Sequence, residues 1–173
     1  MNTKTVTLFF FLTLFLLTTG KARAEVVTSS AEFYQLKQQA ESTLPPEQLW
    51  LRLIEPNTWW HPDHTYSGDA ENLSLDIQAG GYWREDWAQG SVMHGQVLQI
   101  TTNKQLRLNA PFGPLLEKAV NVVWTITITA SEKGSTVVFD EVANGSKYSE
   151  LDKLAPAVDF VKTEAIKRLV QAD

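Results

Sequence analysis

The stretch VVWTITIT, residues 122–129, decides the fold class of this chain. Its even-numbered residues are all large and apolar, and three of its four odd-numbered residues are threonine. This two-residue period is typical of a β-strand with one buried face. Glu132-Lys133-Gly134 follows and predicts a hairpin turn into a partner strand at 136–143. The stretch therefore indicates an antiparallel sheet.

The same period recurs towards the N-terminus and predicts further strands, at 73–77, 82–87, 91–101 and 105–108. A first strand that lies at the edge of the sheet or is half-exposed fits 32–42, although a helix fits this segment as well. Thr43-Leu44-Pro45-Pro46-Glu47 is a helix start, and the short helix it opens ends near Pro56. We expect one more helical turn and then a loop over 57–68.

The C-terminus changes period. Apolar residues from Val158 to Val170 recur at spacings of three and four, which predicts one amphipathic helix starting near Pro156. Its polar face is expected to carry Lys162, Glu164, Lys167 and Arg168. The predicted fold class is α+β, a curved antiparallel sheet with a long C-terminal helix and two short helices after the first strand. The space between helix and sheet either fills with side chains or becomes a ligand cavity.

The N-terminus has the pattern of a secretory signal peptide. Lys4 precedes an apolar run over 6–17, and Ala22-Arg23-Ala24 supplies the small residues of a cleavage site. The run is shorter than the ~20 residues that span a bilayer, which favours cleavage over an uncleaved anchor. We expect a signal peptide at 1–24, cleavage before Glu25, a single domain at 25–173, and a periplasmic or secreted protein without a membrane span.

Charge and composition narrow the function classes. The formal net charge is −5, and removal of the two Lys and one Arg in 1–24 makes it −8. Without a basic cluster, such a surface repels phosphate backbones, so nucleic-acid binding is not expected. There is no G-x-S-x-G frame, so a serine hydrolase is not expected. There is no cysteine, and no third glycine follows Gly80-Gly81 to form a dinucleotide loop, so no cofactor is expected.

A dense aromatic and titratable stretch, residues 59–68, precedes the strands and is expected to cover the mouth of a cavity; it is called the lid below. One of Trp59 and Trp60 is expected in the core and the other against the ligand. His61 and His64, with Asp63, are metal-ligand types. Pro62 interrupts a helix that would present both histidines together, so no metal site is expected.

A hairpin brings two titratable residues together. If Gln89-Gly90 is a two-residue loop, Glu85 directly faces His94, with Cβ atoms about 5 Å apart. Their face of the hairpin also carries several apolar residues and is expected to point inward: Trp83, Trp87, Val92, Leu98 and Ile100. Two alternatives remain, an ion pair on the outer face worth under about 1 kcal/mol, or a one-residue slip that separates the pair.

Long segments of the chain resemble a known superfamily. They are WWHPDHTYSGDAENLSLDIQAGGYWRED (59–86), SVMHGQVLQI (91–100), LRLNAPFGPL (106–115) and VVWTITI (122–128). They resemble the SRPBCC superfamily, in its exported bacterial branch similar to heat-shock ATPase activators and polyketide cyclases. The resemblance implies a helix-grip fold, with the sheet wrapped around the C-terminal helix and a hydrophobic cavity between them. It implies no reaction, because members include lipid carriers, hormone receptors, cyclases and oxygenase subunits.

Two functions are therefore expected in order of preference. The first is binding of a small apolar or amphipathic molecule between sheet and helix, with seven candidate ligand-binding residues: Trp59, Trp60, His64, Trp83, Glu85, His94 and Trp124. The second is a cyclase- or hydratase-type enzyme with Glu85 and His94 as acid and base. A protein-interaction domain without a ligand is a third possibility.

Overall fold

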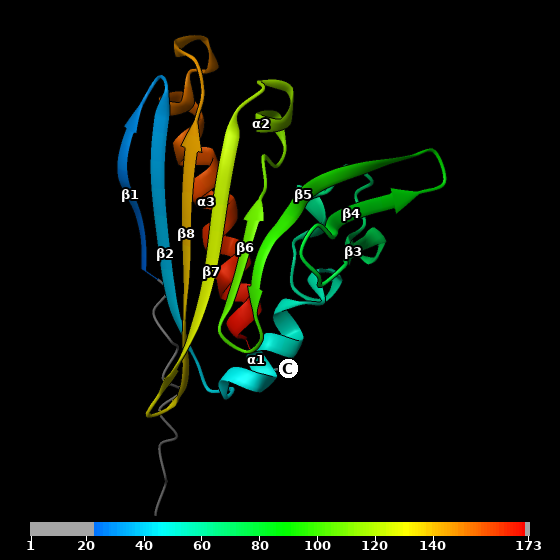
Figure 1. Cartoon of the computed structure of the whole chain (residues 1–173), viewed down its shortest axis with the longest axis vertical. Helices are drawn as coiled ribbons and strands as arrows, with labels where there is room; N and C mark the ends of the chain where they lie inside the picture. Colours follow the sequence, from blue (N-terminus) through cyan, green and yellow to red (C-terminus); the bar gives the residue numbers. More distant parts are fainter. Residues whose placement is uncertain (1–22, 172–173) are drawn as a thin grey trace, which may run out of the picture.

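The computed structural model describes residues 23–171 as an eight-stranded antiparallel sheet with one long helix along it (Figure 1). The strand order across the sheet is β1-β2-β8-β7-β6-β5-β4-β3. The strands are β1 (Arg23–Ser30), β2 (Phe33–Ser42), β3 (Leu73–Leu75), β4 (Tyr82–Trp87), β5 (Gly90–Thr101), β6 (Gln105–Asn109), β7 (Asn121–Ser131) and β8 (Gly134–Asn144). The helices are α1 (Pro46–Leu53), η1 (Pro56–Thr58), η2 (Pro62–His64), η3 (Ala70–Asn72), α2 (Pro114–Glu117), η4 (Lys147–Ser149) and α3 (Leu151–Val170).

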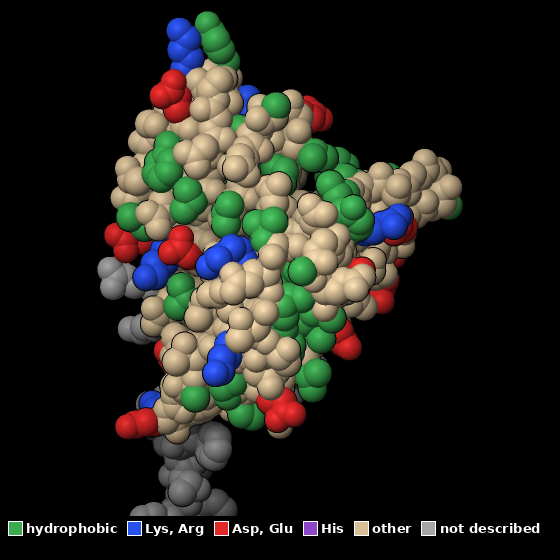
Figure 2. All heavy atoms as spheres, in the orientation of Figure 1, with side chains coloured by type: hydrophobic (Ala, Val, Ile, Leu, Met, Phe, Trp, Pro, Cys, Tyr) green, Lys and Arg blue, Asp and Glu red, His purple; other side chains and the backbone are tan. Residues whose placement is uncertain are grey.

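The predicted α+β class is confirmed. Helix α3 packs against β1, β2 and β8, and the short helices α1 to η3 follow β2 along the chain. Every second residue of β2, β7 and β8 is buried over most of each strand, so one face of the sheet forms the core, as the alternation predicts. The β4–β5 hairpin projects from the body as an arm (Figure 2).

The first strand of the sheet was not predicted. β1 pairs antiparallel with β2. The segment 32–42 therefore forms a strand rather than a helix, but β1 and not β2 lies at the edge of the sheet. β1 includes the expected cleavage site before Glu25, and Glu25 pairs with Lys37 of β2. The expected signal peptide lies almost wholly outside the described residues. Within 23–171, no helix is long and apolar enough to cross a membrane.

Helix α3 begins five residues earlier than predicted, at Leu151 rather than near Pro156. A proline inside a helix removes one backbone hydrogen bond. Tertiary packing outweighs that loss, because Leu151 and Ala155 are fully buried in a cluster that includes Tyr34 and Leu36 of β2. Pro156 itself faces outward.

One residue assigned to the polar face of this helix is buried. Lys162 is only 2% exposed. It lies three and four residues before Ala165 and Ile166, which are both buried, and that spacing places it on the apolar stripe. A lysine is expected to face solvent, but the position of Lys162 on the helix places its side chain in the interior.

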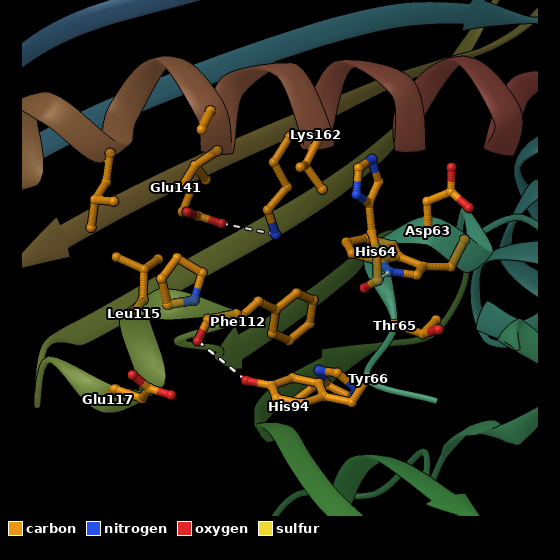
Figure 3. Close-up of a pocket in the computed structure, with 17 residues that line it drawn as sticks. Asp63, His64, Thr65, Tyr66, His94, Phe112, Leu115, Glu117, Glu141 and Lys162 are labelled. Carbon is orange, nitrogen blue, oxygen red and sulfur yellow. Dashed lines mark hydrogen bonds and ion pairs between the residues drawn. The ribbon is translucent and has the colours of Figure 1, made fainter. Parts of the chain in front are cut away.

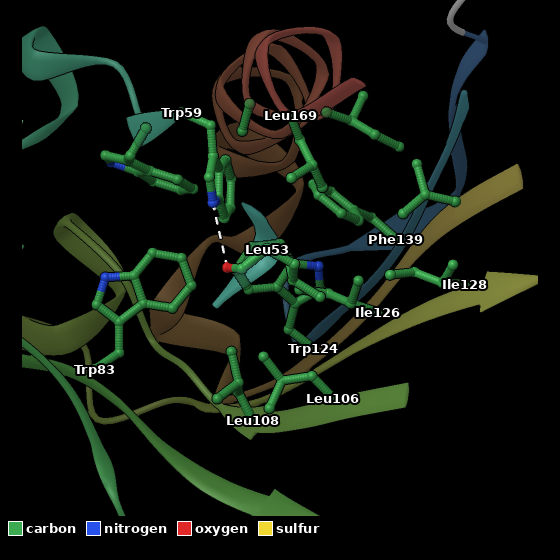
Figure 4. Packing of buried hydrophobic residues seen from close by; sticks show 14 of the residues in the cluster. Leu53, Trp59, Trp83, Leu106, Leu108, Trp124, Ile126, Ile128, Phe139 and Leu169 are labelled. Atoms are coloured by element: carbon green, nitrogen blue, oxygen red, sulfur yellow. Dashed lines mark hydrogen bonds between the residues drawn. The ribbon is translucent and has the colours of Figure 1, made fainter. Parts of the chain in front are cut away.

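Aromatic rings fill the part of the space between α3 and the sheet that lies near Leu169 (Figure 4). Ring centroids are 5.8 Å apart for Trp59 and Trp83, 5.8 Å for Trp83 and Trp124, and 4.9 Å for Trp124 and Phe139. Trp59 also donates its indole N–H to the backbone oxygen of Leu53, at 3.2 Å, which ties the lid to α1. These rings form the core that supports the neighbouring cavity.

Candidate functional site

A cavity of about 480 Å³ lies between α3, α2 and the lid (Figure 3). Its apolar lining comes from all three elements and the Phe112 loop, and includes Trp60, Phe112, Leu115, Leu154, Val158 and Val161. Its polar lining consists of Asp63, His64, Thr65, His94, Glu117, Glu141 and Lys162. The sheet and helix therefore enclose a partly filled space, with a few polar groups on a mainly apolar wall.

The polar lining includes a buried ion pair. Lys162 Nζ of α3 lies 2.9 Å from a carboxylate oxygen of Glu141 of β8, and the two side chains are 2% and 1% exposed. The other Glu141 oxygen accepts a hydrogen bond from the Tyr34 hydroxyl at 2.6 Å. Burial, the Glu141 charge and this hydrogen bond all raise the pKa of Tyr34, so its proton stays in place. Each oxygen of the Glu141 carboxylate therefore has one of these two neighbours as a partner.

The Lys162 amine has more donors than partners. Glu141 lies 2.9 Å from Nζ, and among residues 23–171 no other acceptor lies beside the amine. Its other neighbours are aromatic ring faces, with centroids at 3.0 Å for Trp124 and 4.6 Å for Phe112. Burial lowers the pKa of Lys162 to about 8, against the opposing effect of Glu141. A lysine in this state is a cation with donors left to share.

Glu85 and His94 do meet, but not by the predicted register. The turn residues are Ala88 and Gln89, so Glu85 pairs with Val92 instead of His94. His94 is the extra residue of a β-bulge, and its Nε2 reaches Glu85 diagonally at 2.9 Å. The turn lies one residue earlier than predicted, and this moves the partner of Glu85 by two residues, from His94 to Val92. Because side chains alternate between the two faces of a strand, a shift of two leaves Glu85 and His94 on the same inner face.

The bulge has a sequence signal, because a glycine follows His94. A Cβ at Gly95 would lie 2.9 Å from the backbone oxygen of Asn109, so the close approach to β6 requires glycine here. The extra residue of the bulge also exchanges the inward and outward positions in the rest of β5, so one prediction there is wrong. Leu98, expected on the inner face, is 46% exposed, and Val97 is buried instead.

Glu85 holds the lid in place. One carboxylate oxygen accepts the backbone N–H of Ser67 at 2.5 Å, and the other accepts that of Tyr66 at 3.0 Å. Burial raises the pKa of Glu85, but the hydrogen bonds from Ser67, Tyr66 and His94 together outweigh burial and leave it lowered. Glu85 is therefore ionised and acts only as an acceptor.

This arrangement fixes the tautomer of His94. Burial lowers the pKa of His94 more than Glu85 raises it, so the ring is neutral near pH 7. An ionised Glu85 needs a proton on Nε2, which leaves the lone pair on Nδ1. Within the described chain, nothing bonds Nδ1, and the ring lines the cavity. A ring with a free acceptor and an amine with free donors therefore both line the cavity.

The seven residues predicted for ligand binding divide into two groups. Trp60, His64 and His94 line the cavity. Trp59, Trp83, Glu85 and Trp124 are buried behind this wall and are not among its lining residues. Sequence reasoning missed Lys162, Glu141 and Phe112. Helical spacing to Ala165 and Ile166 was the available signal for Lys162, and alternation with Phe139 and Ala143 was the signal for Glu141.

The lid histidines take part in hydrogen bonds within the lid. His61 Nδ1 accepts the backbone N–H of Asp63 at 3.1 Å, and Trp60 donates its indole N–H to the oxygen of His64 at 3.1 Å. Burial is the main cause that lowers the pKa of His64. Among residues 23–171, no three His, Cys, Asp or Glu side chains are grouped so that they could hold a metal ion.

Comparison with known proteins shows the fold alone. No family model and no curated protein matches the sequence. The chain is similar in structure to an uncharacterized protein from Rhizobium leguminosarum, with a TM-score of 0.58, 16% identity, and coverage of 86% of this chain and 95% of that one. It is also similar to a protein from Rhodobacter sphaeroides, with a TM-score of 0.56, 18% identity, and coverage of 86% of this chain and 96% of that one. A protein of unknown function from Staphylococcus aureus gives a TM-score of 0.57 and 11% identity, with coverage of 80% of this chain and 91% of that one.

Proposed function

We propose that this protein binds a small amphipathic molecule in the cavity between α3 and the sheet, and that it is an exported member of the SRPBCC superfamily. One observation carries the binding proposal: an apolar cavity of about 480 Å³ that contains a buried, incompletely bonded ion pair. Ligand cavities of roughly 300–1,000 Å³ with a few convergent polar groups are typical of small-molecule sites. The sequence motifs at 59–86 and the signal-peptide pattern at 1–24 support the superfamily and the exported location.

The surroundings of the cavity support entry of an apolar molecule. Tyr66 of the lid lines the cavity and is 49% exposed, and its hydroxyl donates to the backbone oxygen of Gly113 at 3.4 Å. Phe160 of α3 is 60% exposed and lies with its ring 6.4 Å from that of His64. Exposed aromatic rings at the edge of an apolar cavity are suited to receive a ligand of the same kind.

Filling the cavity tests the binding proposal. Val158 lines the cavity, so Val158→Trp places an indole in the ligand space. Val138→Trp is the matched control, because Val138 lies on the opposite face of the sheet, between the inward-facing Val137 and Phe139. Calorimetric titration with uncharged naphthalene derivatives should show binding by the wild type and Val138→Trp, and at least about tenfold weaker binding by Val158→Trp. Equal binding by both variants would place the ligand elsewhere.

A second function, proton transfer at a bound carbonyl compound, is favoured by the free Nδ1 of His94. Glu85 does not line the cavity, so in this proposal His94 is the catalytic base and Glu85 its positioning residue. NMR of 2-acetylnaphthalene in D₂O would report exchange of its methyl protons. We expect exchange above the buffer rate with the wild type and loss of it with His94→Gln. Exchange at the buffer rate with the wild type would contradict catalysis while leaving binding untouched.

A further inference from the structure

The polar residues of the cavity indicate the chemistry of the ligand, whereas the cavity volume indicates only its size. We infer that Lys162 binds the polar end of the ligand, and that this end is an uncharged oxygen acceptor, such as a carbonyl, rather than a carboxylate. The inference rests on the proposed binding function. It begins from the side-chain amine of Lys162, which is directed into the space between Glu141 and Phe112 (Figure 3).

Hydrogen bonding explains why an acceptor is needed. An ammonium group has three N–H donors, and this one has Glu141 on one side and the faces of Trp124 and Phe112 on others. Ring faces attract the cation but accept no full hydrogen bond. A buried donor without an acceptor is costly, and in the described chain Nζ has no acceptor beside it other than Glu141. An oxygen atom of a ligand would supply it.

Charge explains why that oxygen is neutral. Glu141 already balances the charge of Lys162 at 2.9 Å, and its own second oxygen is used by Tyr34. A ligand carboxylate would place a second negative charge beside Glu141 in a desolvated space, where like charges are strongly unfavourable. The ring of His94 also contacts Phe112, at 5.2 Å between centroids, and it is neutral near pH 7. No further cation lines the cavity among residues 23–171.

A matched series of three compounds separates these cases. 2-Ethylnaphthalene, 2-acetylnaphthalene and 2-naphthoate share one ring system and differ only in the group presented to Lys162. With the wild type at pH 7, the ketone should bind at least about tenfold more tightly than the hydrocarbon and than the carboxylate, which is the size of one hydrogen bond to a charged donor. Equal binding of ketone and hydrocarbon, or tightest binding of 2-naphthoate, would overturn the inference.

Two variants test the residues. Lys162→Met with Glu141→Gln removes both charges, so the ketone should lose its advantage while 2-ethylnaphthalene binds within about threefold of its wild-type affinity. Glu141→Gln alone leaves Lys162 uncompensated, so 2-naphthoate should become the tightest of the three. An unchanged order in both variants would also overturn the inference. If even 2-ethylnaphthalene fails to bind the wild type, the binding function itself is contradicted and the role of Lys162 falls with it.

Discussion

Lys162 of α3 and Glu141 of β8 face each other across the cavity wall with 2.9 Å between charged atoms, and both side chains are almost completely buried. Removing one partner of a buried ion pair leaves an uncompensated charge, which typically costs about 3–5 kcal/mol. We therefore expect Lys162→Met to lower the free energy of unfolding by that amount. Urea denaturation monitored by tryptophan fluorescence measures the change.

The surface of the same helix supplies a control. Lys167 and Glu164 are also 2.9 Å apart, but their side chains are 47% and 35% exposed, so Lys167→Met should cost under about 1 kcal/mol. The double variant Lys162→Met with Glu141→Gln should recover most of the lost stability, because no buried charge is left. A loss for Lys162→Met no larger than that for Lys167→Met would contradict the buried pair.

The same pair predicts the stability profile at alkaline pH. The pKa of Lys162 is about 8 in the folded protein, against 10.5 for an ordinary lysine exposed to water, as in the unfolded chain. Between these values the unfolded state binds more protons, so the contribution of Lys162 to stability rises with pH. Tyr34 acts in the opposite direction above pH 10, because its pKa is raised. Glu141, Tyr34 and His94 are the titratable groups that face Lys162.

The measurable window is therefore pH 8 to 10. The free energy of unfolding of the wild type, measured relative to the double variant Lys162→Met with Glu141→Gln, should increase across this window. Urea denaturation at half-unit pH steps provides the comparison. A difference that stays flat or falls would show that the folded protein does not hold Lys162 as a destabilised cation.

Much of this fold follows from local sequence patterns. The alternation in 122–129 and 136–143 predicted β7 and β8, and Thr43 to Glu47 predicted the start of α1 at Pro46. β1 was not predicted because residues 23–30 show no clear alternation of apolar and polar side chains and overlap the expected cleavage site. The start of α3 was misplaced because burial of Leu151 and Ala155 outweighs the local preference of Pro156.

The candidate site was less predictable, since it depends on contacts between distant segments. Residue types and the hairpin signal brought Glu85 and His94 together, but a bulge that no turn rule describes sets their true geometry. The roles of Ser67 and Tyr66 arise from backbone N–H groups, which side-chain reasoning does not see. Whether a cavity forms beside Trp124 is decided by how many rings fill the space, which periodicity cannot show.

His94 predicts loss of stability on mild acidification. Its pKa is lowered from 6.5 by burial, so below pH 6.5 the unfolded chain takes up a proton that the folded protein does not. Stability should thus fall as pH decreases from 6.5 towards the folded pKa. The lowered pKa of Glu85 adds a further loss below pH 4.5.

Substitution of the ring isolates the first of these effects. His94→Gln removes the titrating group, so the slope of unfolding free energy between pH 6.5 and 5 should be smaller than in the wild type. Two-dimensional NMR of the imidazole resonances gives the pKa of His94 directly. A value at or above 6.5 would mean that Glu85 stabilises the imidazolium and that Nδ1 carries a proton, which would remove the acceptor assigned to the cavity.

Glu85→Gln should loosen the lid locally. The carboxylate accepts backbone N–H groups from both Ser67 and Tyr66, whereas an amide has one acceptor oxygen and turns its NH₂ group towards the other donor. One partly buried N–H is then unpaired, at a cost of about 1 kcal/mol. Hydrogen exchange of these two amides should accelerate at least about tenfold, while amides in the centre of β7 and β8 keep their protection relative to global unfolding. Glu47→Gln, at an exposed position of α1, is the matched control and should leave lid exchange unchanged. Equal exchange in both variants would show that Glu85 does not hold the lid.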